Sequence, residues 1–223
     1  ISDYEGAQII HDLNFDIPVQ LEKKYDVVID GGTLEHIFNF PVAIFNCMKM
    51  VKEGGSIFIF SMSNNHCGHG FYQFSPELFF RLFQPEYGFD IKSVVLMKHP
   101  FPGAELSKKQ ECYKVKDPAI LGRRSTLVTK SPLGIMVHAK KIEHKNFVES
   151  FPIQSDYAKI FNTAIDTVKD KDKSKNKEIN FNLKLLLRDI ILKLPPSIKN
   201  FFIGYHQLWK FSLKRDKEMY TRY

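Results

Sequence analysis

The chain has 223 residues, of which 43% are hydrophobic and 26% charged, values typical of a globular protein with a sizeable core. Residues 182–223 hold nine basic and three acidic residues and so carry most of the net charge of +7, which excludes a strongly basic, nucleic-acid-binding core. The three cysteines have no Cys-x-x-Cys spacing, which argues against a disulfide framework or a zinc finger; we expect a reducing, cytoplasmic environment.

The first part of the chain alternates strand-like and helix-like patterns. Residues 7–11 predict a short strand, and residues 25–30 predict a second strand with a β-branched centre. Residues 41–51 predict a helix, because Pro41 suits a first turn and apolar residues follow at helical spacing. The apolar run 56–61 is typical of a strand that is buried on both faces of a sheet.

Further elements follow in the same order. Residues 75–77, Ser-Pro-Glu, are a helix start with an N-cap, a proline and an acid in the first turn. Residues 91–97 and 133–142 predict two more strands, separated by a charged insertion at about 100–132 that lacks periodicity. Residues 1–145 therefore predict an α/β domain with a mostly parallel sheet.

The remainder, residues 146–223, predicts a helical extension. Its three expected helices cover residues 155–169, 182–194 and 198 to about 219, with a charged linker at 169–178. Aromatic residues in the basic segment 182–223 lie beside lysines and arginines, so peripheral contact with a membrane surface is one interpretation. The apolar stripe is not clean, which favours docking on the core or on a second subunit, or packing as a lid over the substrate.

Four segments resemble class I S-adenosylmethionine-dependent methyltransferases: AQIIHDLN, YDVVIDGGTLEHI, MVKEGGSIFIF and NNHCGHGFYQFSPELF. The resemblance implies a Rossmann-like, mostly parallel sheet with a C-terminal antiparallel strand pair. It also implies S-adenosyl-L-methionine as cofactor and a small-molecule or glycan-type methyl acceptor. The family's first strands and glycine-rich loop are missing. Since the chain begins with Ile1, we expect an N-terminally truncated form that binds the cofactor poorly.

The resemblance assigns cofactor contacts to residues at the ends of two strands. They are Asp12, Leu13, Asp30, Gly31, Gly32 and Glu35. The carboxylate of Asp12 would accept the adenine amino hydrogens and the amide of Leu13 would donate to a ring nitrogen; alternatively, Asp12 and Asn14 only shape a turn. The glycine pair would let a ligand approach the backbone closely, or would simply form a tight turn.

The polar loop at residues 64–75 follows the central apolar strand, where the methyl acceptor is expected to approach. His69 and Tyr72 are candidates for acceptor binding or for the base that deprotonates an acceptor hydroxyl. His36 is a third candidate, because imidazole exchanges protons near neutrality. A loop that is only internally hydrogen-bonded is the alternative. No metal site is expected in this loop, since no second ligand cluster accompanies it.

These patterns favour a methyltransferase as the function of the full-length protein. Two alternatives stay open: an inactive Rossmann-like interaction module that uses its basic tail, and another nucleotide-binding α/β enzyme such as a glycosyltransferase. Binding of S-adenosylhomocysteine would favour the methyltransferase hypothesis, and binding of a nucleotide sugar would favour the glycosyltransferase hypothesis.

Overall fold

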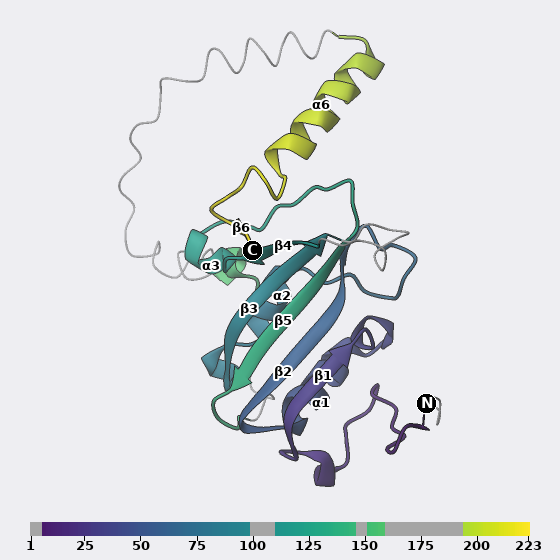
Figure 1. Cartoon of the computed structure of the whole chain (residues 1–223), viewed down its shortest axis with the longest axis vertical. Coiled ribbons are helices and arrows are strands. Elements are labelled where there is room, and N and C mark those ends of the chain that lie inside the picture. The colour runs from purple at the N-terminus through teal and green to yellow at the C-terminus, as the bar shows by residue number, and fades with distance from the viewer. Residues whose placement is uncertain (1–5, 99–109, 146–150, 159–193) are drawn as a thin grey trace, which may run out of the picture.

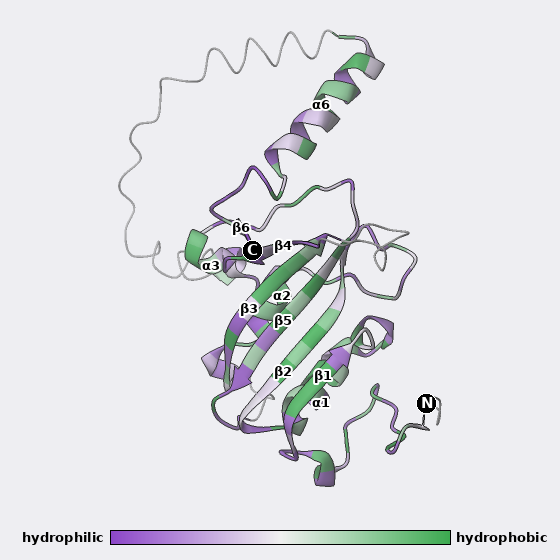
Figure 2. Ribbon diagram, viewed as in Figure 1, coloured by the Kyte–Doolittle hydropathy of each residue, from purple (hydrophilic) through white to green (hydrophobic). Residues whose placement is uncertain are grey.

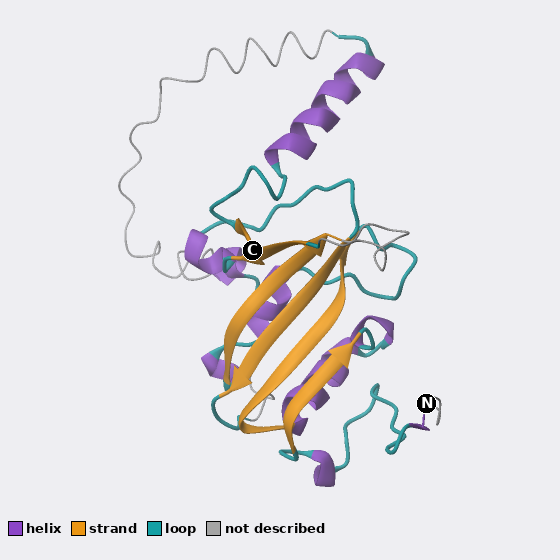
Figure 3. Ribbon diagram, viewed as in Figure 1, coloured by secondary structure: helices purple, strands orange, loops and turns teal. Residues whose placement is uncertain are grey.

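A computed structural model describes residues 6–98, 110–145, 151–158 and 194–223, and its centre is one six-stranded sheet (Figures 1 and 3). The strands are β1 (Tyr25–Gly31), β2 (Val51–Asn64), β3 (Phe89–Lys98), β4 (Glu111–Val115), β5 (Leu133–Lys141) and β6 (Tyr220–Arg222). The helices are α1 (Phe40–Met50), α2 (Pro76–Leu82), α3 (Pro118–Leu121) and α6 (Pro196–Lys210). Short 3-10 turns are η2 (Val19–Leu21), η3 (Leu34–His36) and η4 (Pro85–Tyr87).

The sheet is mixed and mostly antiparallel, with the order β1-β2-β5-β3-β4-β6. Only β1 and β2 pair in parallel, while the other four strand pairs are antiparallel. The expected Rossmann-like, mostly parallel sheet is therefore wrong. An apolar run predicts a strand but not its direction or its neighbours, and β5 inserts between β2 and β3 and runs opposite to both. The carboxyl ends of β1, β2 and β3 consequently lie at the same end of the sheet.

Most of the locally encoded elements are confirmed. The strands expected at 25–30, 91–97 and 133–142 appear as β1, β3 and β5, and the two helices of the first half appear as α1 and α2. The expected start of α2 is also confirmed, since Ser75 Oγ accepts a hydrogen bond from the Leu78 amide at 3.4 Å.

Other expectations about single elements are wrong. Residues 7–11 form no strand, and Ile9 and Ile10 are exposed. The insertion at 100–132 contains β4 and α3 rather than only irregular chain. The last helix ends at Lys210, and β6 follows it. Residues 155–158 are helical, whereas residues 159–169, the linker at 169–178 and residues 182–193 of the helix expected at 182–194 lie outside the described residues; Leu194 is described and is not helical.

Helices α1 and α2 cover one face of the sheet, and the core lies between these two layers (Figure 1). Inward-facing residues of β2 such as Ile57 and Ile59 are buried there. On the opposite face Ile29 and Phe58 are exposed, although the strands that carry them are strongly apolar (Figure 2). Strand β2 is thus buried on one face only, which corrects the expectation of burial on both faces.

The C-terminal residues return to the sheet beyond α6. No residue of α6 is buried, and Figure 1 shows the helix projecting beyond one end of the sheet. Leu213 and Tyr220 are buried, and β6 pairs with β4 at the sheet edge. Arg123 donates two hydrogen bonds to Asp216, at 2.6 and 2.7 Å, and these stabilise the segment between α6 and β6. No helix among the described residues is long and apolar enough to cross a membrane.

Candidate functional site

The loop that follows β1 is organised by Asp30. Its Oδ1 accepts hydrogen bonds from the amides of Thr33 at 3.0 Å and Leu34 at 3.2 Å, which closes the turn before η3. Gly32 has φ +98°, a conformation that side chains rarely adopt, so the turn needs a glycine there. Burial raises the pKa of the Asp30 carboxyl above its usual range, and the nearby Glu35 raises it further. Asp30 thereby fixes the loop that presents Glu35.

Glu35 is the most deeply placed charged residue of the site. Its side chain is fully buried, although it lies on a short turn at the edge of the core. Its Oε2 accepts a hydrogen bond from the Ser61 hydroxyl at 2.7 Å, whereas its Oε1 has no hydrogen-bond partner. His69 Nε2 lies 3.5 Å from Oε1. The structure therefore puts Glu35 beneath the polar loop rather than on an open ligand surface.

The polar loop is fastened to Glu35 by its backbone. The amides of Phe71 and Tyr72 donate to the Glu35 carbonyl oxygen at 2.9 and 3.2 Å. A Cβ atom on Gly70 would lie 2.8 Å from the same oxygen, so a larger residue at this position would push the loop away. At its other end, Asn65 donates to the carbonyl of Thr129 at 2.8 Å. The position of His69 is consequently set by both neighbouring segments.

Two of the three predicted catalytic residues come together here. The rings of His36 and His69 are 5.1 Å apart, and both side chains are exposed. One possible ligand atom from each of Glu35, His36 and His69 lies within 4.8 Å of the others. Tyr72 is different, because its hydroxyl donates to the Phe38 carbonyl at 2.6 Å and helps to hold the loop.

Sequence reasoning missed the part played by Ser61. A serine that ends a long apolar run was the available signal, since a buried hydroxyl needs a hydrogen-bond partner. The partner, Glu35, comes from another strand-end loop, 26 residues away in the chain. Local patterns do not show that these two residues meet. The grouping of Glu35 with His36 and His69 was missed for the same reason.

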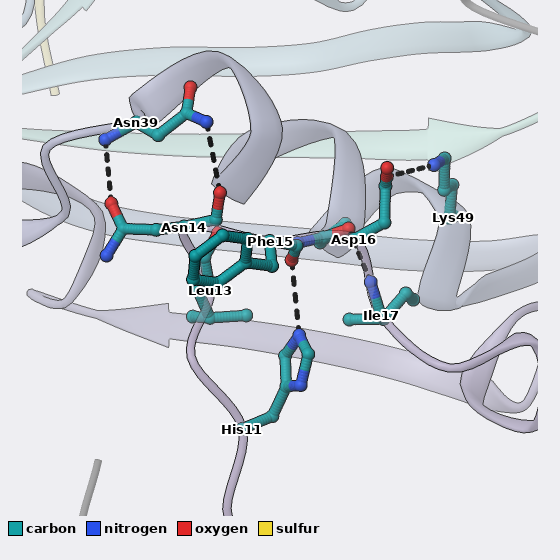
Figure 4. Close-up of polar contacts among 9 residues, drawn as sticks. His11, Leu13, Asn14, Phe15, Asp16, Ile17, Asn39 and Lys49 are labelled. Atoms are coloured by element: carbon teal, nitrogen blue, oxygen red, sulfur yellow. Dashed lines mark hydrogen bonds and ion pairs between the residues drawn. The ribbon is translucent and has the colours of Figure 1, made fainter.

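Asp12 and Leu13 lie on the N-terminal loop, of which Figure 4 labels Leu13. Asp12 Oδ1 accepts from the Asn14 amide at 3.0 Å and from its side chain at 2.8 Å, so the turn-shaping alternative is realised. These hydrogen bonds, the backbone one first, lower the pKa of the Asp12 carboxyl. Asn39 donates two further hydrogen bonds to Asn14, from its amide to Asn14 Oδ1 at 2.9 Å and from its side chain to the Asn14 carbonyl at 3.0 Å (Figure 4). Because Asn39 immediately precedes α1, this places the turn near the loop that follows β1; the contact of Asp12 and Leu13 with a cofactor stays a prediction.

Neither a protein-family model nor a curated protein matches the chain. Together with the mixed, mostly antiparallel sheet, this result overturns the identification as a class I methyltransferase from four short segments. Each segment encodes a strand end, a turn or a helix start, and many α/β proteins share such pieces. The geometry of the site is therefore the basis for inferring a function.

Proposed function

We propose that the protein transfers a methyl group from S-adenosyl-L-methionine to a small-molecule or glycan-type acceptor. This proposal rests on one observation: the glycine-containing tip of β1 and the polar loop that bears His69 lie next to each other at one end of the sheet. The glycine-paired tip of β1 leads directly into Glu35, and the loop that bears His69 is fastened to the Glu35 backbone. A donor and an acceptor bound on these two surfaces would be neighbours, and such proximity is the main requirement of group transfer.

The donor side fits an adenosyl ligand in two respects. No atom lies within 4 Å of the place where a Cβ on Gly31 would stand, so a ligand can rest against the backbone there. The buried Asp30 carboxyl has one oxygen, Oδ2, without a hydrogen-bond partner. A cation nearby would favour the charged form of this carboxyl and offset its burial. When bound, the cofactor would supply that cation as its sulfonium, together with the methyl group.

The acceptor side is formed by Glu35, His36 and His69. The exposed imidazoles of His36 and His69 can bind an acceptor oxygen. The carboxylate of Glu35 is buried and lies on the core side of the cluster. Tyr72 positions this surface through its hydrogen bond to Phe38. The cluster thus supplies polar groups that can orient an acceptor hydroxyl, either directly or through an ion that these residues bind.

The test is calorimetric titration of the protein with S-adenosylhomocysteine. We expect one molecule to bind, and Gly31→Val to weaken its affinity at least roughly tenfold, or about 1.4 kcal/mol. The substitution should not disturb folding, because the space around Gly31 is open and valine suits a strand. Gly68→Val is the matched control, since Gly68 also faces open space but lies on the acceptor loop.

Two outcomes would overturn the proposal. One is a folded protein that does not bind S-adenosylhomocysteine but binds a nucleotide sugar, which would favour glycosyl transfer. The other is an unchanged affinity in Gly31→Val, which would place the ligand away from the tip of β1.

A further inference from the structure

Glu35, His36 and His69 have the composition of a metal site. Candidate ligand atoms from the three residues lie within 4.8 Å of one another. Around a tetrahedral ion with bonds of about 2.1 Å, ligand atoms are about 3.4 Å apart. The two histidine side chains are exposed and can rotate, so contraction to this spacing needs no movement of the core. Two imidazoles and one carboxylate are the ligand types that first-row transition metals prefer.

A second observation points to a ligand in the same place. Glu35 is fully buried, yet its Oε1 has no hydrogen-bond partner. Leaving a buried charged oxygen unsatisfied costs more than an ordinary missing hydrogen bond, so native structures usually supply a partner. The neighbouring Oε2 is already held by the Ser61 hydroxyl at 2.7 Å. A serine that fixes one carboxylate oxygen while the other faces a metal is a common outer-shell arrangement.

A simple ion pair between Glu35 and His69 explains less. The separation of 3.5 Å between Oε1 and Nε2 is long for a charge-assisted hydrogen bond, which is typically about 2.7–2.9 Å. The ion pair also gives no role to His36, whose ring lies beside that of His69 at 5.1 Å. A cation between the three side chains would satisfy Oε1 and use both imidazoles.

We propose that Glu35, His36 and His69 bind a divalent first-row transition-metal ion. Three protein ligands leave coordination positions open, and the exposed histidines keep these positions accessible to water or to a substrate oxygen. A metal ion here lowers the pKa of an oxygen ligand and can polarise it. The site rests on the geometry of this chain and does not depend on methyl transfer.

The test is a titration of chelator-treated protein with Co²⁺, followed by visible absorption, and with Zn²⁺, followed by calorimetry, both without any cofactor. We expect one equivalent to bind. His36→Ala and His69→Ala should weaken binding by more than the roughly 10–100-fold that loss of an outer-shell partner causes, and Ser61→Ala should weaken it within that range. His66→Ala is the matched control, because His66 shares the loop but lies outside the cluster.

Glu35→Gln keeps the size of the side chain and its contact with Ser61, so its loss of metal affinity reports the charge rather than the fold. Thermal melting of each variant checks that it is folded. Absence of Co²⁺ and Zn²⁺ binding by the wild-type protein would overturn the site, as would equal weakening by His66→Ala and His69→Ala. Since no cofactor is present, failure of methyl transfer leaves this result unaffected.

Discussion

Lys141 Nζ donates a hydrogen bond to the Met48 carbonyl oxygen at 2.8 Å, near the end of α1. A second bond reaches the Val51 carbonyl, also at 2.8 Å, and the lysine side chain is fully buried. A cation at a helix C-terminus satisfies carbonyls that have no partner within the helix and interacts favourably with the helix dipole. This contact ties the end of β5 to the helix that covers β1 and β2.

Burial lowers the pKa of Lys141 from 10.5 to about 8, so its contribution to stability depends on pH. Between pH 8 and 10.5 the unfolded lysine keeps a proton that the folded one has released, and stability therefore rises with pH in this window. We expect the free energy of unfolding of the wild type, minus that of Lys141→Met, to increase from pH 8 to pH 10. Denaturant titrations at several pH values measure this difference in the free energy of unfolding. Lys140→Met is the control, because Lys140 is the exposed neighbour of Lys141. A difference for Lys141→Met that does not change with pH would contradict the prediction.

The two faces of the sheet predict unequal effects of the same substitution. Ile59 on β2 is 2% exposed, whereas Ile29 on β1 is 73% exposed. We expect Ile59→Ala to lower the free energy of unfolding by about 2–5 kcal/mol, because it removes methylene groups from the packed core. Ile29→Ala should change it by less than about 0.5 kcal/mol. Urea unfolding compares the two; a large loss in Ile29→Ala would show that this face is covered.

Gly70 and Gly68 offer a matched pair within the polar loop. A Cβ on Gly70 would meet the Glu35 carbonyl oxygen at 2.8 Å, while a Cβ on Gly68 meets nothing within 4 Å. Gly70→Ala should therefore displace the loop and weaken Co²⁺ binding at least roughly tenfold, or about 1.4 kcal/mol. Gly68→Ala should leave Co²⁺ affinity unchanged. If both substitutions act equally, the backbone contact with Glu35 does not position the loop.

The cysteines should differ sharply in reactivity. Burial raises the pKa of the Cys47 thiol to about 12, with a further contribution from the nearby Asp30, whereas Cys67 is exposed on the polar loop. Alkylation requires thiolate and access, so iodoacetamide near pH 8 should modify Cys67 in the native protein and leave Cys47 intact. Peptide mass spectrometry reads both sites. In denaturant both should react, which controls for intrinsic differences; native labelling of Cys47 at the rate of Cys67 would refute the packing of α1.

Local signals in the sequence determined several elements correctly. Ser75 at the N-cap and the following proline specify the start of α2, and helical spacing specifies α1. The apolar runs identify β1, β3 and β5, since alternating or continuous apolar residues reflect only the immediate chain geometry. The resemblance of four such pieces to a methyltransferase added a global order that the sheet does not follow.

The candidate site was foreseen in parts and not as a unit. His36, His69 and Glu35 were all singled out, but with separate roles, and Ser61 was not named. Ser61 and Glu35 meet because β1 and β2 lie side by side in parallel, so that the loop after one strand faces the end of the other. The contact between Ser61 and Glu35 therefore depends on how the two strands pair, which neither segment shows alone.

The sequence by itself determined where this chain forms α1, α2, β1, β3 and β5, because hydrophobic spacing and capping act over a few residues. The antiparallel pairing of β3 with β5 was expected and is confirmed. Only the tertiary structure decided that β5 also pairs antiparallel with β2, and that Glu35 is buried against Ser61 beneath His69. Both depend on contacts between distant segments, whose free energy comes from burying side chains together and leaves no periodic trace in the sequence.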